Sequence, residues 1–353
     1  MNVVTKVERQ LEGVIYMKLI KHIATTAGAV ALVLSQSAAF ADTKVSLSSQ
    51  PNEAGFPMWL ANDLGYFKDR GLEIDIEYFP NGGAALATGA TGQWQAGWTG
   101  GPPAVSGWEK FQLISVGAMQ KESQNLKLVI RNDAMEGKTP AEALAATKIG
   151  TVPNSTWSQV LYACAAHLGV TDAESLDIVP LTPAVTIQSL QSGDLGAGTT
   201  AASADLPLIN DPDTYTMVCD GKMAGSEIIA PYIVTKKFWD DDPASTAAYV
   251  EAVYRANEYI TATDPAKVVE HVLAYYKDTG IDGDAVKAEY AMRMRDWVSL
   301  DQAIADVDSG LTNETLTGAA EVLVAGGARD TVPDFGPMAP LALEILKAAK
   351  ALR

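Results

Sequence analysis

The chain has 353 residues, of which 43 are acidic and 26 are lysine or arginine, so its formal net charge is −17 at pH 7. An acidic surface excludes nucleic acids and anionic membranes as expected partners, because both carry negative charge themselves. The length exceeds what one hydrophobic core usually holds, so two lobes are expected.

Residues 1–41 have the pattern of an N-terminal extension followed by a secretory signal peptide. Two lysines precede an apolar stretch over 27–34, and Ala39, Phe40 and Ala41 match the A-x-A cleavage pattern. The apolar stretch is too short to span a membrane. We therefore expect cleavage after Ala41 and a periplasmic product.

Strands and helices alternate along the rest of the chain, which is typical of α/β lobes with parallel sheets. The first lobe is expected over 42–131 and again over 232–353, where it is largely helical. The second lobe is expected over 132–231, with the polar segment 132–139 as the crossover. The predicted strands are 45–49, 73–79, 113–118, 126–131, 148–152, 176–181, 197–200, 215–219 and 228–235. The predicted helices include 56–69, 84–91, 140–146, 183–191, 265–277, 283–297, 313–326 and 341–351.

Two loops, 92–103 and 193–202, share one pattern: Gly-x-(large apolar)-x-Ala-Gly, followed by small or hydroxylated residues. Each is predicted to carry a strand that ends just before a helix begins. An open α/β sheet presents its ligand site at such a point. Two loops of this kind in one chain predict two sheets that face one cleft.

A third loop, 154–157, precedes a helix in the second lobe. Ser155 or Thr156 can cap that helix, and its free N–H groups can then hold an oxygen-rich group; an ordinary cap is the alternative. Trp98 and Trp157 either wall the cleft or pack in the lobe cores. The candidate ligand contacts are Glu53, Gly55, Phe56, Trp98, Thr99, Gly100, Asn154, Ser155, Thr156, Trp157, Thr199, Thr200 and Tyr232.

The charged residues give a weaker indication about the ligand. None of these loops contains Arg, so backbone N–H groups and hydroxyls, or an Arg from elsewhere, would have to hold an anion. Arg293 and Arg295 are expected on a late helix. Glu53, Glu122 and Glu227 lie near the expected cleft by chain order. They favour a zwitterion or a ligand with an amine or amide over a bare anion, unless they are solvated loop residues.

Signatures of catalysis and metal binding are absent from the sequence. It has no G-x-S-x-G, G-x-x-x-x-G-K-[ST] or H-E-x-x-H motif, and His167 and His271 belong to no cluster with metal-ligand spacing. We therefore expect no catalytic residues, no metal and no cofactor. Cys164 and Cys219 form either one disulfide or two buried free thiols, and the sequence leaves this open.

The signal peptide, the segment 57–74 and the two loops together resemble the solute-binding proteins of ABC importers. The subgroup is the one for nitrate, sulfonates, taurine and thiamine-precursor pyrimidines, and its A-x-x-x-G-[YF]-F-x-x-x-G-L pattern matches 61–72. The resemblance implies a two-lobed periplasmic-binding-protein fold of type II, a cleft between the lobes and a helical C-terminal part. It also implies a monomer that docks on a membrane permease.

The chain departs from the subgroup at three places. Gln95 and Gly196 stand where the family usually has Asp, and 203–207 replaces a Trp and Pro often found after the second loop. The ligand therefore does not carry over from any one member. A small sulfonate or zwitterion such as taurine is the leading expectation, and a planar heterocycle such as a thiamine-type pyrimidine is second. A pyrimidine-synthesising enzyme on the same scaffold and a sensor subunit are the remaining alternatives.

Overall fold

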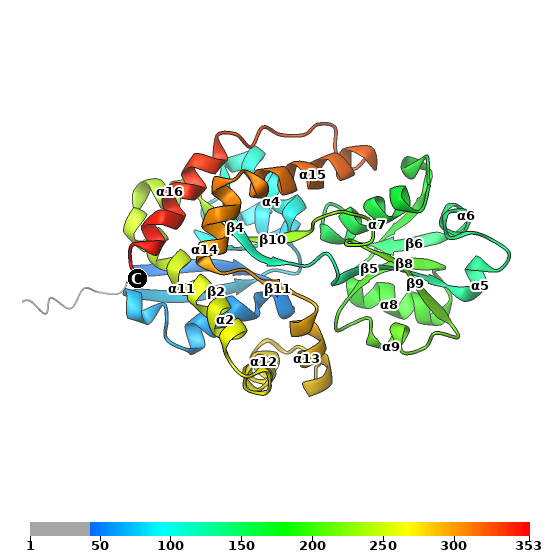
Figure 1. Cartoon of the computed structure of the whole chain (residues 1–353), viewed down its shortest axis with the longest axis horizontal. Coiled ribbons are helices and arrows are strands. Elements are labelled where there is room, and N and C mark those ends of the chain that lie inside the picture. The colour runs from blue at the N-terminus through cyan, green and yellow to red at the C-terminus, as the bar shows by residue number, and fades with distance from the viewer. Residues whose placement is uncertain (1–42) are drawn as a thin grey trace, which may run out of the picture. The chain divides into compact units, whose positions relative to one another are not determined.

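The structure is a computed structural model that describes residues 43–353. Within these residues the chain forms a mixed α/β fold with 11 strands in two sheets and 15 α-helices (Figure 1). This confirms the expected fold class with its helical C-terminal part, since β11 ends at Trp297 and three helices follow it. The predicted signal peptide and its cleavage site lie outside the described residues.

The first sheet has six strands in the order β11-β4-β10-β3-β1-β2. β1 runs parallel to β2 and β3, β10 runs antiparallel to β3 and β4, and β11 runs antiparallel to β4. The expectation of parallel pairing is therefore correct for three of the six strands. The strands are β1 Thr43–Ser49, β2 Leu72–Tyr78, β3 Ala96–Trp98, β4 Leu113–Lys121, β10 Ile229–Thr235 and β11 Asp296–Trp297.

The second sheet has five strands in the order β7-β6-β8-β5-β9. β6 runs parallel to β7 and β8, whereas β5 runs antiparallel to β8 and β9. The strands are β5 Leu126–Arg131, β6 Lys148–Thr151, β7 Asp177–Pro180, β8 Ala197–Ala201 and β9 Tyr215–Asp220. We call the first sheet with the helices that cover it lobe 1, and the second sheet with its helices lobe 2.

One strand joins a different sheet from the one that the sequence predicts. β5 was expected in lobe 1, but it pairs with β8 and β9 of the second sheet. The chain therefore leaves the first sheet at 122–125, and the segment 132–139 contains the short helix α5 Asn132–Met135 of lobe 2. The apolar pattern of β5 predicts a buried strand, but such a pattern does not specify the partner strand.

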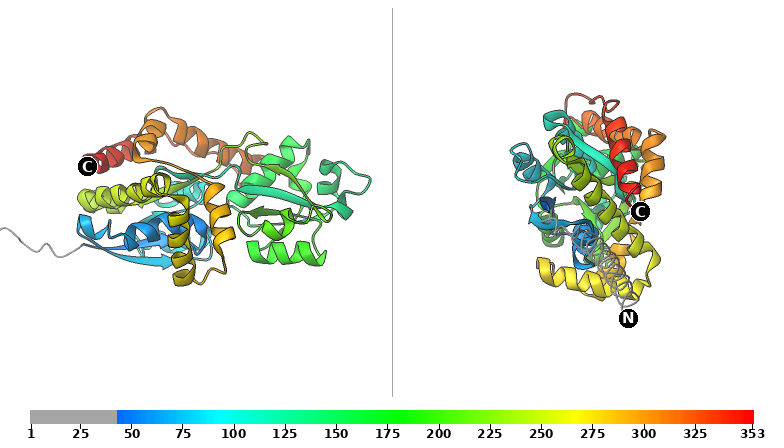
Figure 2. Two further views of the ribbon diagram at one scale, coloured as in Figure 1. Left: turned by 60° about the horizontal axis from the view of Figure 1, so that its bottom comes forward. Right: turned by 90° about the vertical axis from the view of Figure 1, so that its left-hand side faces the viewer.

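The helices of lobe 1 come from both ends of the described chain. The helix predicted over 56–69 ends at Asp63, because Gly65 takes the left-handed backbone conformation (φ +74°). Figure 2 shows α16 in red, and it packs along α11 beside the first sheet. The elements are η1 Glu53–Gly55, α2 Phe56–Asp63, η2 Lys68–Arg70, α3 Gly82–Gly89, α4 Gly101–Phe111, α10 Lys236–Asp241, α11 Pro243–Ala262, α12 Pro265–Thr279, α13 Ala285–Arg293, α14 Leu300–Asp308, α15 Leu311–Ala325 and α16 Met338–Lys350.

The helices of lobe 2 are fewer and mostly shorter. α7 packs on β5, β8 and β9, and α8 packs on β8. α15 contacts both α4 of lobe 1 and α7 of lobe 2, so it links the two lobes. Besides α5, the elements are α6 Pro140–Ala145, α7 Thr156–His167, η3 Ala173–Ser175, α8 Pro183–Ser192 and α9 Leu206–Ile209.

The two lobes differ in the size of their hydrophobic cores. Lobe 1 has one large core in which Trp94 and Tyr254 are fully buried. Lobe 2 has two smaller cores, one that includes Leu128 and Ile130 and one that includes Val129. These three neighbours on β5 serve both cores because successive side chains of a strand point to opposite faces of the sheet.

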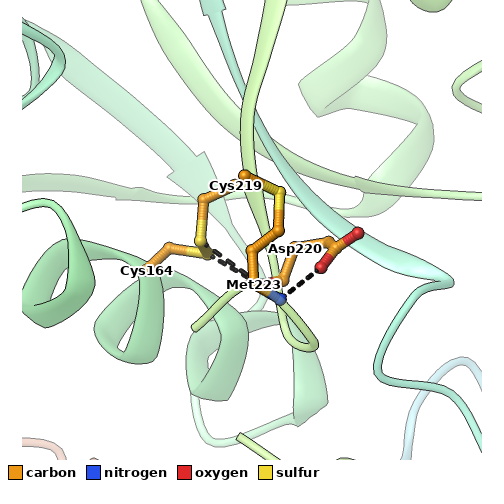
Figure 3. The surroundings of a disulfide bond; sticks show 4 residues. All are labelled: Cys164, Cys219, Asp220 and Met223. Atoms are coloured by element: carbon orange, nitrogen blue, oxygen red, sulfur yellow. Dashed lines mark hydrogen bonds between the residues drawn. A yellow bond between two sulfur atoms is a disulfide. The ribbon is translucent and has the colours of Figure 1, made fainter. Parts of the chain in front are cut away.

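Lobe 2 contains a disulfide between Cys164 on α7 and Cys219 on β9, two residues 55 positions apart in the sequence (Figure 3). The structure thus selects one of the two alternatives that the sequence left open. In the turn after β9, the N–H of Met223 donates to Asp220 Oδ1 at 2.8 Å. The disulfide fastens α7 to an edge strand of the second sheet.

Candidate functional site

A cavity of about 430 Å³ is lined by residues from both lobes. Most of its wall follows the carboxyl ends of six parallel strands, which are β1, β2 and β3 of the first sheet and β6, β7 and β8 of the second. Open α/β sheets bind their ligands at these strand ends. The wall residues from these segments are Gln50, Asn52, Glu53, Ala54, Pro80, Asn81, Gly82, Trp98, Gly100, Pro103, Val152, Pro153, Ser155, Thr156, Trp157, Pro180, Leu181, Thr182, Pro183, Ala201, Ala202 and Ala204.

The two Gly-x-x-x-Ala-Gly loops occupy equivalent positions in the two sheets. Residues 96–97 lie on β3 and pair in parallel with β1, and residues 197–198 lie on β8 and pair in parallel with β6. β3 ends at Trp98 and β8 ends at Ala201, and both of these residues line the cavity. The repeated sequence pattern therefore marks two strand ends that border the same cavity.

Six of the predicted contacts line this cavity, namely Glu53, Trp98, Gly100, Ser155, Thr156 and Trp157. Trp98 is the most firmly held of them. Only 4% of its surface is exposed, and its indole Nε1 donates to Ser49 Oγ at 2.9 Å. Trp98 thus answers to both alternatives, because it lines the cavity and also belongs to the core of lobe 1 with its indole N–H satisfied.

The helix α7 has the predicted cap, and this cap occupies one of the first-turn N–H groups that the sequence assigns to a ligand. Ser155 Oγ accepts the Trp157 N–H at 3.2 Å and donates to the Val152 carbonyl at 2.7 Å. The Ser155 N–H in turn donates to Ser158 Oγ at 3.1 Å. Ser155 therefore caps the helix and also lines the cavity. The start of this helix lines the cavity at Ser155, Thr156 and Trp157.

Gly100 and Thr156 lie where the two lobes approach each other. A Cβ added at Gly100 would lie 2.9 Å from Thr156 Cγ2, which is closer than Cβ atoms tolerate. Nearby, Ser203 Oγ of lobe 2 donates to Glu53 Oε1 of lobe 1 at 2.8 Å. Position 100 therefore needs glycine for α7 to come this close to lobe 1.

Two predicted contacts, Phe56 and Tyr232, belong to the core of lobe 1 and do not line the cavity. Both side chains are 0% exposed. The Tyr232 hydroxyl donates to Asn257 Oδ1 at 2.9 Å. The prediction that they contact the ligand is therefore wrong, because both side chains lie on the buried face of their element and pack against other helices.

Thr199 and Thr200 do not line the cavity either, because they lie before the last residue of β8, where the strand meets the cavity. Thr199 Oγ1 is hydrogen bonded to Thr151 Oγ1 at 2.8 Å, inside the second sheet. Thr200 is fully buried. The residues of this segment that line the cavity are Ala201 at the end of the strand and Ala202 and Ala204 after it.

The last three predicted contacts outside the lining are Gly55, Thr99 and Asn154. A Cβ at Gly55 would lie 2.6 Å from Tyr275 Oη, so this glycine packs against α12. Thr99 directly follows Trp98 on extended chain, where neighbouring side chains point opposite ways. Asn154 has a positive φ of 51° in the turn before α7.

The charged residues at the cavity include one that the sequence did not select. Glu122, Asn125, Leu126 and Arg295 complete the lining. The helix predicted over 283–297 ends at Arg293, so Arg295 lies in the short link between α13 and β11. No motif marks this link. The one indication in the sequence is the lack of Arg in the cleft loops, which leaves backbone N–H groups and hydroxyls, or an Arg from elsewhere, to hold an anion.

Glu53 and Glu122 both line the cavity, whereas Glu227 lines a separate smaller pocket. Glu122 Oε2 accepts hydrogen bonds from Gln120 Nε2 at 2.8 Å and from Asn125 Nδ2 at 3.4 Å. Burial raises the pKa of the Glu122 carboxyl above its ordinary value, and attraction to Arg295 opposes this shift. Glu53 Oε1 additionally accepts from Tyr276 Oη at 3.3 Å.

The lining thus combines two carboxyl groups, one guanidinium, two indoles and several amides. It contains no histidine or cysteine. In residues 43–353 no group of three or more His, Cys, Asp or Glu side chains is arranged to hold a metal ion. Within the same residues no helix combines the length and apolar character needed to cross a membrane. The arrangement suits the non-covalent binding of a small polar molecule with charges of both signs.

The family model described as NMT1/THI5 like matches residues 52–267, more than half of the chain. Among solved structures, the periplasmic nitrate-binding protein NrtA from Synechocystis PCC 6803 is similar with a TM-score of 0.67 and 12% identity, over 88% of this chain and 89% of that one. The alkanesulfonate-binding protein SsuA from Xanthomonas axonopodis pv. citri gives 0.60 and 14%, over 80% and 97%. The aliphatic sulphonate binding protein SsuA from Escherichia coli gives 0.61 and 15%, over 78% and 94%. No curated protein sequence matches the chain.

Proposed function

The chain belongs to the NMT1/THI5-like family and has the fold of periplasmic ABC-type solute-binding proteins, and from this premise we propose that it is the solute-binding component of an ABC importer. Its ligand is a small sulfonate or zwitterion such as taurine. The lobes enclose this solute in the periplasm and deliver it to the membrane permease. The protein acts as a monomer, needs no cofactor and leaves the solute chemically unchanged.

The observation that carries the choice of ligand is the presence of both charge signs at the cavity. Glu53 and Glu122 can hold an ammonium group, and Arg295 can hold an acidic group. A bare anion such as nitrate would face two carboxyl groups and only one guanidinium. A zwitterion places its ammonium group near the carboxyl groups and its acidic group near the guanidinium, so each charge of the solute has an opposite charge beside it.

Contacts between the lobes support closure around the solute as the binding mechanism. Ser203 and Glu53 are joined across the cavity, and Thr156 packs close to Gly100. Contacts of this kind exist only while the lobes are together. A solute that touches both lobes adds further contacts to the closed state and so shifts the population towards it.

A planar heterocycle such as a thiamine-type pyrimidine is the second candidate. Trp98 and Trp157 both line the cavity, and Asn81 and Asn125 supply amide groups that can pair with ring nitrogens. A pyrimidine-synthesising enzyme on this scaffold has less support, because the lining offers no His or Cys. A sensor subunit would use the same cavity, and genes for a permease and an ATPase next to this gene would favour the importer.

A thermal-shift screen of the purified protein tests the proposal. The panel contains taurine, β-alanine, alkanesulfonates without an amine, betaines, nitrate and pyrimidines. A ligand at about a thousand times its Kd stabilises the folded state by about 4 kcal/mol, which raises the melting midpoint. We expect taurine or another zwitterion to give the largest rise. A rise with pyrimidines alone would establish the second candidate, and no rise with any compound would contradict solute binding of this kind.

A further inference from the structure

Lys127 and Arg295 are the buried basic side chains of residues 43–353, with 5% and 7% of their surface exposed. Lys127 Nζ lies 2.6 Å from Asp205 Oδ2 and 3.1 Å from Tyr290 Oη, so the protein itself neutralises its charge. Arg295 has no carboxylate oxygen within 4.0 Å among the same residues. Of these two buried cations, only Arg295 lacks a direct ion pair, and the carboxyl of Glu122 attracts it from a greater distance.

Two of the three guanidinium nitrogens of Arg295 are also without an acceptor in the described residues. Nη1 donates to the Ala291 carbonyl at 2.6 Å. Nε is buried and has no hydrogen-bond partner, and no bond is made by Nη2. Leaving a buried charged donor unpaired is costly, so a bound group that pairs with it gains more than it would at the surface.

The backbone on both sides of Arg295 is fixed. α13 ends two residues before it, and β11 begins directly after it and pairs with β4. The Nη1 bond to Ala291 ties the side chain back to the last turn of α13. The remaining Nε–Nη2 edge is therefore held in place before any ligand arrives, which lowers the entropy cost of binding.

We infer that Arg295 binds the carboxylate or sulfonate of the solute through its guanidinium group and thereby selects solutes that carry such a group; this rests on the proposed function. Two parallel N–H donors of a guanidinium match two oxygens of an acidic group. Glu122, which lines the same cavity, adds to the selection because it disfavours a second anionic group on the solute. Arg295 is a specificity-determining residue in this scheme.

Isothermal titration calorimetry on matched variants tests this inference. The probes are taurine, β-alanine and ethanolamine, which share an amine and differ in the group at the other end. Arg295→Gln should bind taurine and β-alanine at least about thirtyfold more weakly than the native protein, while ethanolamine binding hardly changes. Arg295→Lys keeps the charge but loses the two-donor edge, and should lose about tenfold. Arg293→Gln removes an exposed charge two positions away and serves as the control.

The ratio of taurine to ethanolamine affinity separates recognition from structure. A purely structural role for Arg295 would weaken all three probes equally and leave this ratio unchanged, and that result would overturn the inference. Native-like taurine binding by Arg295→Gln would overturn it as well, with the importer proposal intact. If the native protein binds none of the probes or the screened solutes, the proposed function fails and this inference fails with it.

Discussion

The two lobes have the same strand ends at the cavity but provide different chemistry there. All charged side chains of the lining come from lobe 1 or from the crossover that leaves it: Glu53, Glu122 and Arg295. Lobe 2 contributes hydroxyls, an indole, prolines and small side chains, and no charged residue of its own among the described ones. This division suggests that lobe 1 selects the solute and lobe 2 encloses it.

The lobes also differ in what stabilises them. Lobe 1 has a large continuous core, whereas lobe 2 divides its apolar residues between two smaller cores and adds a disulfide. Less apolar surface removed from water means less stabilisation, and a covalent link compensates by restricting the unfolded chain. The comparison yields four predictions, which begin with this difference in stability.

The largest effect is expected from removal of the disulfide by Cys164→Ala together with Cys219→Ala. A link across 55 residues stabilises the folded state by about 4 kcal/mol in the chain-entropy model. Chemical denaturation should show lobe 2 unfolding first in the variant, reported by Trp157, which lies on α7 as Cys164 does. A midpoint equal to that of the native protein would mean that the small cores of lobe 2 suffice without the link.

Next in size is the effect of Trp157→Ala on ligand affinity. Loss of an aromatic contact from an enclosing lobe should cost about 1–3 kcal/mol, which is roughly fivefold to 150-fold in Kd. Because lobe 2 carries no charge at the cavity, the loss should be similar for taurine, β-alanine and ethanolamine in calorimetry. A loss confined to one probe would show that lobe 2 also selects, and would break the division between the lobes.

The Glu122 carboxyl gives the third prediction, through pH. Because its pKa is raised in the folded protein, it stabilises the fold below its ordinary pKa of about 4.3, and this contribution is lost as pH rises through the raised value. Glu122→Gln should therefore melt at a higher temperature than the native protein at neutral pH, and the difference should shrink in acid. A pH-independent difference in melting temperature would contradict the buried placement of this carboxyl.

The smallest effect is expected from Ser203→Ala, which removes the bond to Glu53 across the cavity. The bond is only partly buried, so its loss should weaken binding by about 1 kcal/mol or less. The change should act on closure and affect all solutes alike. The matched control is Ser226→Ala, which changes a serine outside this cavity. If the two variants bind the solutes with equal affinity, the Ser203–Glu53 hydrogen bond has no role in closure.

The sequence predicted the fold better than it predicted the site. The repeated Gly-x-x-x-Ala-Gly pattern located both strand ends, because such a pattern reports local backbone geometry. The pattern also led to the prediction that Thr199 and Thr200 contact the ligand, although both lie inside β8. Where a strand ends depends on its pairing with neighbouring strands, which the pattern does not report. Arg295 was not selected, because its place at the cavity depends on tertiary packing of the link between α13 and β11.

A crystal structure of the protein with the tightest binder of the screened panel would test the central claim most directly. We expect the solute in the cavity, with its acidic group at Arg295, its amine at Glu53 or Glu122, and Trp157 of lobe 2 in contact with it. Electron density for the solute on one lobe alone, or outside the cavity, would contradict the account.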